Sequence, residues 1–81
     1  LDNLDKKLLK IIKIRTDIIK KVIQLKNNKS EIVDRKRIAY ILRRIKKESI
    51  KKNIDPLITK KIWKCMIWSY IDFERKNFKR K

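Results

Sequence analysis

The stretch LDNLDKKLLKIIKIRTDIIKKVIQLK at residues 1–26 decides the fold, because its apolar side chains recur at helical spacing. Consecutive members of one apolar series lie three, four or seven residues apart, which places them in a single stripe along a helix. The stripe consists of Leu4, Leu8, Ile11, Ile18, Val22 and Leu25. The polar cluster at residues 27–30 ends the pattern. We therefore predict one helix over residues 1–26.

Two more helices are predicted further along the chain. Asp34 suits an N-cap or first-turn position, and the apolar residues that follow it indicate a helix over residues 34–52. Asp55 followed by Pro56 is typical of an N-cap and a first helical residue. A third helix is therefore expected over residues 56–80.

The absence of glycine, the single proline and the long first helix together predict the architecture. A chain without glycine is poorly suited to β-hairpins and to phosphate-binding loops, so we predict an all-α, three-helix chain in one domain over residues 1–81. The first helix would be about 39 Å long, whereas a globule of this chain length would be only about 30 Å across. Because the apolar stripe runs along the whole helix, we expect an intertwined helical homodimer in which a second copy covers the remainder. A monomeric three-helix hairpin with a frayed end is the alternative.

The composition excludes several classes of protein. The chain has 26 lysine and arginine residues against 9 aspartate and glutamate residues, no histidine, and one cysteine, Cys65. These counts leave no internal disulfide, no plausible zinc or redox-metal site, and no histidine base for the usual hydrolases. No apolar run approaches the ~20 residues that cross a bilayer. We expect a soluble, cytoplasmic protein with no cofactor, no metal and no membrane contact, whose natural chain begins before Leu1.

Two cations lie on the apolar face of the first predicted helix. Arg15 fills the gap in the stripe, and its neighbours at helical spacing are all isoleucines. Lys26 follows eleven residues later, about 20° away around the helix. Burying an unpaired cation costs several kcal/mol, so this face requires either water or an anion brought from elsewhere. The alternative is that both side chains extend to solvent.

Glu74 presents the opposite case, an acid among uncharged neighbours that include Tyr70. A carboxyl group in apolar surroundings can stay protonated and donate a hydrogen bond, although an ion pair with a lysine is the alternative. Arg37 follows Asp34 by three residues, a spacing that lets the acid orient the guanidinium or form an ordinary surface pair. Together these residues predict a pocket for a small dianion, with a reaction driven by shape and electrostatics.

In order and spacing, these residues resemble the small all-helical chorismate mutases and their relatives, the isochorismate pyruvate lyases. The resemblance covers nearly the whole chain and rests on the opening LDKKLL at residues 4–9, the pair Arg15 and Lys26, and three later groups. Those groups are Val33 and Asp34 with Arg37, then Ile54, Asp55 and Pro56, and finally Tyr70 with Glu74. The resemblance implies an interlocked homodimer of three-helix chains that binds chorismate or isochorismate.

The resemblance also implies roles for single residues. Arg15 would bind a substrate carboxylate, and Lys26 would reach a carboxylate and the ether oxygen of the substrate. Glu74, where the family has glutamine or glutamate, would donate a hydrogen bond to the same oxygen. Arg37 is similar to the second-helix arginine of the pocket, and Asp34 matches the acidic position before it. In the rearrangement of chorismate to prephenate negative charge grows on the ether oxygen, which such donors stabilise.

Three positions depart from the family pattern or cannot be compared. Ile38 stands where typical mutases place a glutamate that holds the ring hydroxyl of the substrate, which resembles the lyase branch. Tyr70 stands where a small polar residue is common, and is assigned to the substrate-binding set. The family's N-terminal arginine would precede Leu1. The balance favours a chorismate mutase, with an isochorismate pyruvate lyase as the alternative.

A basic helical nucleic-acid-binding module is the non-enzymatic alternative, because a charge of +17 on 81 residues is typical of such proteins. The basic pairs are scattered over every predicted helix, however, and no recognition helix with a glycine turn is present. We therefore expect the excess positive charge to steer an anionic substrate inward rather than to bind nucleic acid.

Overall fold

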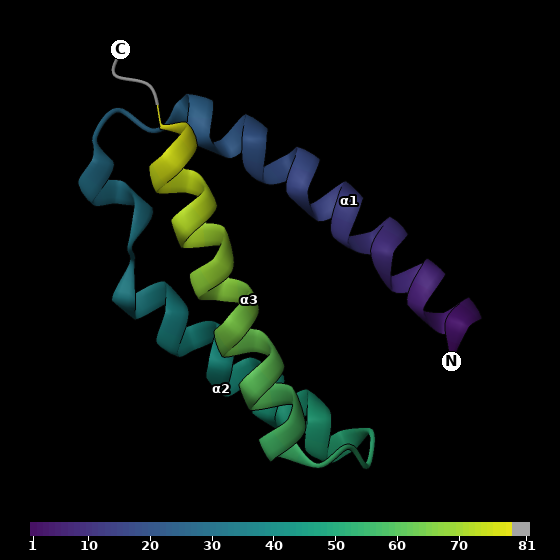
Figure 1. Cartoon of the computed structure of the whole chain (residues 1–81). Coiled ribbons are helices and arrows are strands. Elements are labelled where there is room, and N and C mark those ends of the chain that lie inside the picture. The colour runs from purple at the N-terminus through teal and green to yellow at the C-terminus, as the bar shows by residue number, and fades with distance from the viewer. Residues whose placement is uncertain (79–81) are drawn as a thin grey trace.

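The computed structural model describes residues 1–78 and consists of three α-helices and one short 3₁₀ helix (Figure 1). Their bounds are α1 Asp2–Leu25, η1 Lys29–Ile32, α2 Arg35–Lys51 and α3 Pro56–Asn77. Helix accounts for 86% of the structure without any strand in the part described, which confirms the all-α, three-helix prediction. The predicted third helix ran to residue 80, but α3 ends at Asn77, and residues 79–81 lie outside the described part.

Local capping interactions set the ends of α2 and α3. The Asp34 carboxylate accepts a hydrogen bond from the backbone N–H of Arg37 at 3.0 Å, and Asp55 accepts one from Leu57 at 2.9 Å. Each carboxylate satisfies a backbone donor that the first turn leaves free. Two residues after the end of α2, Asn53 has a φ of 56°, a left-handed conformation that asparagine tolerates well.

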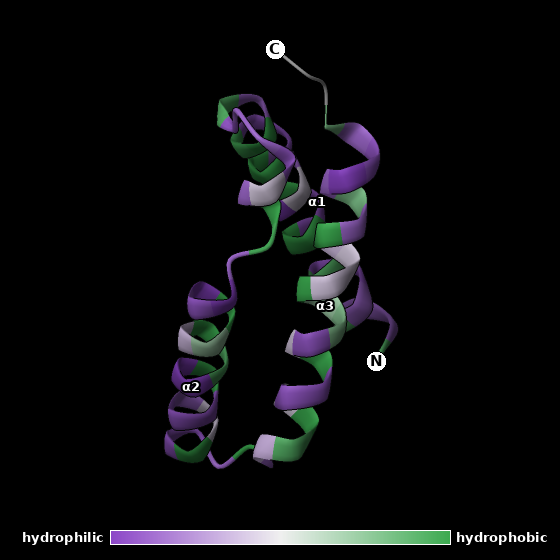
Figure 2. Ribbon diagram, turned by 90° about the vertical axis from the view of Figure 1, so that its left-hand side faces the viewer, coloured by the Kyte–Doolittle hydropathy of each residue, from purple (hydrophilic) through white to green (hydrophobic). Residues whose placement is uncertain are grey.

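Helices α2 and α3 form an antiparallel hairpin around that turn. Near the turn a hydrogen bond between two hydroxyls joins the helices, with the oxygens of Ser49 and Thr59 2.7 Å apart. Both residues are buried. The Ser49 hydroxyl also bonds to the carbonyl of Ile45 at 2.6 Å, so the pair is satisfied internally. Figure 2 shows hydrophobic segments of the two helices alternating with polar ones along this hairpin.

Helix α1 diverges from the hairpin toward its N-terminus and meets α3 along its second half, from Ile12 onward (Figure 1). Its residues Thr16, Ile19 and Ile23 are half-buried or buried there. The predicted apolar stripe lies on another face of α1, about 100° around the helix axis from the face that meets α3. Leu4, Leu8, Ile11, Ile18, Val22 and Leu25 are all exposed in the single chain.

The molecule is therefore open rather than closed around a core. Its radius of gyration is 14.4 Å, against about 12 Å for a compact chain of this length. Among residues 1–78 the buried apolar side chains are Ile23, Ile32 and Ile71. No helix in that range has both the length and the apolar character of a membrane-spanning segment.

Candidate functional site

A partly buried ion pair joins the end of α1 to α3. Lys26 Nζ lies 2.8 Å from Glu74 Oε1, and the side chains are 19% and 10% exposed. Lys26 is the C-cap of α1 and its extended backbone turns the chain at that point, while Glu74 comes from the last turns of α3. The pair brings together two residues that are 48 positions apart in the sequence. The sequence left open whether Glu74 is a protonated acid or pairs with a lysine, and the structure has the ion pair.

This pair differs from the other ion pairs within residues 1–78, which join neighbours three or four residues apart on exposed helix surfaces. They are Lys13 with Asp17, Glu48 with Lys51, and Asp72 with Arg75. Exposed pairs of that kind contribute only about 0–1 kcal/mol. A pair withdrawn from water, in contrast, makes each partner depend on the other, because removing one leaves a buried charge.

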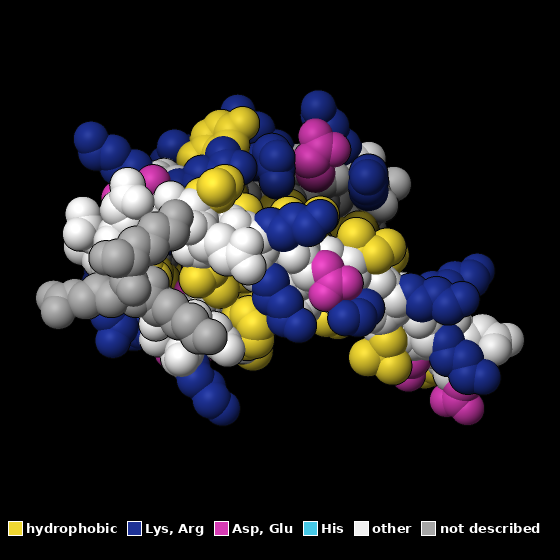
Figure 3. All heavy atoms as spheres, turned by 90° about the horizontal axis from the view of Figure 1, so that it is seen from above, with side chains coloured by type: hydrophobic (Ala, Val, Ile, Leu, Met, Phe, Trp, Pro, Cys, Tyr) yellow, Lys and Arg dark blue, Asp and Glu magenta, His cyan; other side chains and the backbone are white. Residues whose placement is uncertain are grey.

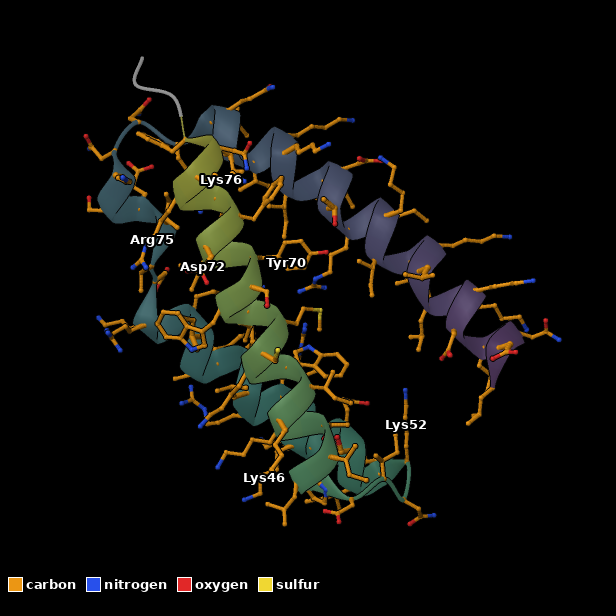
Figure 4. All side chains as sticks on the ribbon, viewed as in Figure 1. Lys46, Lys52, Tyr70, Asp72, Arg75 and Lys76 are labelled. Carbon is orange, nitrogen blue, oxygen red and sulfur yellow. The ribbon has the colours of Figure 1, made fainter. Side chains whose placement is uncertain are left out.

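Arg15 lies on the same side of α1 as Lys26, three helical turns before it. Its guanidinium carbon is 5.9 Å from the centre of the Tyr70 ring, a cation–π geometry. The Tyr70 side chain points from α3 toward α1 (Figure 4). Its hydroxyl lies 2.8 Å from Thr16 Oγ1 and donates to the Ile12 carbonyl at 3.3 Å. The structure thus places Arg15, Lys26, Tyr70 and Glu74 along one junction between α1 and α3.

The two cations differ in exposure. Lys26 is half-buried, as its place on an apolar face predicts, whereas Arg15 is exposed in the single chain. Within one chain Arg15 therefore has the solvent-exposed arrangement that was the alternative, while its enclosure by a second copy stays a prediction. The reason is geometric, because α1 diverges from α3 toward its N-terminus, which leaves Arg15 exposed among residues 1–78.

The predicted residues on α2 form a separate group. Asp34 caps the helix through the backbone N–H of Arg37, and the Arg37 guanidinium lies 5.1 Å over the ring of Tyr40 instead. The expectation that Asp34 orients this guanidinium is therefore wrong, because the N-cap geometry directs the carboxylate to the backbone. Ile38 is half-buried one position further along. Within residues 1–78 no side-chain hydrogen bond, ion pair or cation–π contact joins Asp34 or Arg37 to the α1–α3 junction.

Sequence reasoning missed Thr16, which ties Tyr70 to α1. The signal was a polar residue next to Arg15 at helical spacing from Ile12, on the side that faces α3.

Hollows are found elsewhere on the molecule, including one of about 260 Å³ between α2 and α3 lined by Ile45, Pro56 and Lys60. Within residues 1–78 no cluster of three histidine, cysteine, aspartate or glutamate residues could hold a metal ion.

The surface around the junction combines cations and uncovered apolar groups. Figure 3, which shows the molecule from above, has lysine and arginine side chains spread over that face with apolar side chains between them. A net charge of +17 raises the local concentration of anions at such a surface. The arrangement suits recognition of a small anion, with a fixed ammonium, a guanidinium and one carboxyl group as its polar groups.

Comparison with protein families gives a match over most of the chain. The family model described as chorismate mutase type II matches residues 1–75. Neither the curated proteins nor the solved structures give a significant match. The matched range includes the whole α1–α3 junction and the caps of α2 and α3. The chain therefore belongs to the chorismate mutase type II family.

Proposed function

We propose that this chain catalyses the rearrangement of chorismate to prephenate at the junction between α1 and α3. The observation that carries the proposal is the ion pair between Lys26 and Glu74, with Arg15 on the same side of α1. Family membership supports a mutase-type reaction. The reaction needs no nucleophile and no metal, only groups that hold a dianion and stabilise the charge that develops during bond breaking.

Each polar group of the junction has a role in this mechanism. Arg15 binds one carboxylate of the substrate with its planar guanidinium, which matches carboxylate geometry. When substrate enters, the ammonium of Lys26 turns from Glu74 to a carboxylate and the ether oxygen. Glu74, released from the ion pair, takes up a proton from water and donates a hydrogen bond to the same oxygen. The C–O bond breaks ahead of C–C bond formation, so both donors bind the transition state more strongly than the ground state.

Two substitutions at position 74 test the hydrogen-bond donor. The side-chain amide of Glu74→Gln can donate to the ether oxygen, so this variant should keep turnover of chorismate within about tenfold of the wild type. Glu74→Leu cannot donate, and its kcat should fall by about a hundredfold to a thousandfold. Steady-state kinetics would measure both variants. Equal turnover in the two variants would remove Glu74 from the mechanism.

The proposed site is completed by a second copy of the chain. The apolar stripe of α1 is uncovered, and Arg15 lies at its edge, so a partner helix on the stripe would enclose the guanidinium. An interlocked homodimer would bury that stripe, and each buried leucine or isoleucine contributes about 1.5–3 kcal/mol. Helix α1 of the partner would then supply the outer wall of the pocket.

Adjacent leucines on α1 allow a matched test of the homodimer. Leu8 lies on the stripe and is 55% exposed, whereas Leu9 lies on another side of the helix and is 65% exposed. Sedimentation of the wild-type chain at micromolar concentration should show two chains. Leu8→Lys should yield monomers and little activity, while Leu9→Lys should remain dimeric. A monomeric wild-type chain would rule out the interlocked model.

Ile38 favours the isochorismate pyruvate lyase as a second candidate. This half-buried isoleucine replaces an acid that would hold the ring hydroxyl of chorismate, and isochorismate carries its hydroxyl on a different ring carbon. Separate incubations with chorismate and isochorismate, followed by identification of the products, decide between the two. Prephenate from chorismate supports the proposed function. Salicylate and pyruvate from isochorismate, without prephenate, would establish the lyase instead.

A further inference from the structure

We infer that Tyr70 and Thr16 act as a positioning pair for Arg15, in which the hydroxyl link between α3 and α1 fixes the aromatic ring on which the guanidinium lies. The two side-chain oxygens are 2.8 Å apart and connect residues 54 positions apart in the sequence. The inference rests on the proposed function, because Arg15 is the group that binds the substrate carboxylate there. It assigns Tyr70 a role through Arg15 rather than through contact with the substrate.

The hydrogen bonds fix Tyr70 at its hydroxyl end. Thr16 bonds to the Ile12 carbonyl at 2.8 Å, so its hydroxyl already has a defined position on α1. Tyr70 bonds to that hydroxyl and lies 3.3 Å from the same carbonyl. A ring held at both its Cβ and its hydroxyl cannot swing away from α1. Its π-face therefore remains in place beneath Arg15.

This arrangement matters because Arg15 has no acidic partner among the described residues. A guanidinium without such a partner samples many side-chain conformations, and each must be given up when a carboxylate binds. The fixed ring limits those conformations before the substrate arrives. Because the carboxylate of the substrate is bound in both the ground state and the transition state, the pair should affect KM more than kcat.

Tyr40 provides a matched control on α2. Its ring lies beneath Arg37 at 5.1 Å and Arg44 at 6.0 Å, so it also contacts guanidinium groups. Tyr40 is 47% exposed, and its hydroxyl makes no hydrogen bond within residues 1–78. Removing the Tyr40 hydroxyl should therefore leave the motion of Arg15 and the KM unchanged. Removing the Tyr70 hydroxyl should free its ring to move away from α1.

The first arm of the test measures motion of Arg15 without any substrate. We would record ¹⁵N relaxation of the Arg15 side-chain Nε in the wild-type chain and in Tyr70→Phe, Thr16→Val and Tyr40→Phe. The order parameter should be near that of rigid backbone, about 0.8, in the wild-type and Tyr40→Phe proteins. It should fall below about 0.6 in Tyr70→Phe and Thr16→Val. Equal values in all four proteins would overturn the inference.

The second arm measures kinetics with chorismate. Tyr70→Phe and Thr16→Val should each raise KM by about threefold to tenfold, the effect of one neutral hydrogen bond, with little change in kcat. The double variant should be no worse than either single variant, because both remove the same link. A fall in kcat with KM unchanged, or additive losses, would contradict the positioning role. If the wild-type chain produced no prephenate while Arg15 was rigid only with the pair intact, the proposed function would fail and the positioning would stand.

Discussion

Arg15→Ala should lower kcat/KM for chorismate by about a hundredfold to a thousandfold, the range for loss of one preorganised charged donor. The side chain is exposed in the single chain, and its guanidinium lies over the ring of Tyr70. Its removal takes an unpaired cation from an apolar face, so the helical circular dichroism and the unfolding temperature should stay close to those of the wild type. Steady-state kinetics and thermal melts would measure the two effects separately.

Lys20→Ala is the matched control for this loss. It removes one positive charge from the same helix at an exposed position that is neither on the apolar stripe nor on the face toward α3. Its activity should stay within about twofold of the wild type, because an exposed charge at a distance acts only by screened steering. Similar losses in the two variants would mean that net charge, and not the Arg15 contact, supports activity.

Lys26→Met should reduce both activity and stability. The ammonium is the proposed donor to the ether oxygen, so kcat should fall by about a hundredfold to a thousandfold. Glu74, 7% exposed when the whole residue is counted, would lose its ion-pair partner. This loss should lower the free energy of unfolding by about 3 kcal/mol. Denaturant unfolding and steady-state kinetics would measure the two losses.

A second substitution separates these losses. Lys26→Met combined with Glu74→Leu removes both charges and replaces them with apolar side chains, so most of the lost stability should return while activity stays low. Activity that returned together with stability would show that the pair only holds α1 against α3. In that case the chemistry would have to be sought elsewhere in the molecule.

The helices could be predicted from sequence because their signals are local. The cap at Asp55 and the proline after it lie within three residues of the groups they affect, and the structure places the start of α3 there. The face of α1 that packs on α3 could not be predicted. The stronger apolar stripe on that helix is the uncovered one, and periodicity alone does not tell which of two apolar faces meets the same chain.

The site was only partly predictable, for the same physical reason. Charges on an apolar face drew attention to Lys26 and Glu74, but their pairing at 2.8 Å depends on how α1 and α3 cross. Thr16 carried no charge and was overlooked, although it anchors Tyr70. The exposure of Arg15 in one chain depends on how far α1 diverges from α3, which the local sequence does not determine.

The most direct measurement of the central claim is a titration followed by ¹H–¹⁵N NMR. The ligand should be a stable bicyclic ether dicarboxylate that resembles the transition state, because such compounds bind more tightly than substrates. The account predicts saturable shifts for the Arg15 side-chain Nε and for the backbone amides of Lys26 and Glu74, with the α2–α3 turn at Asn53 unaffected. Shifts confined to other parts of the chain, or no shifts at ligand excess, would contradict it.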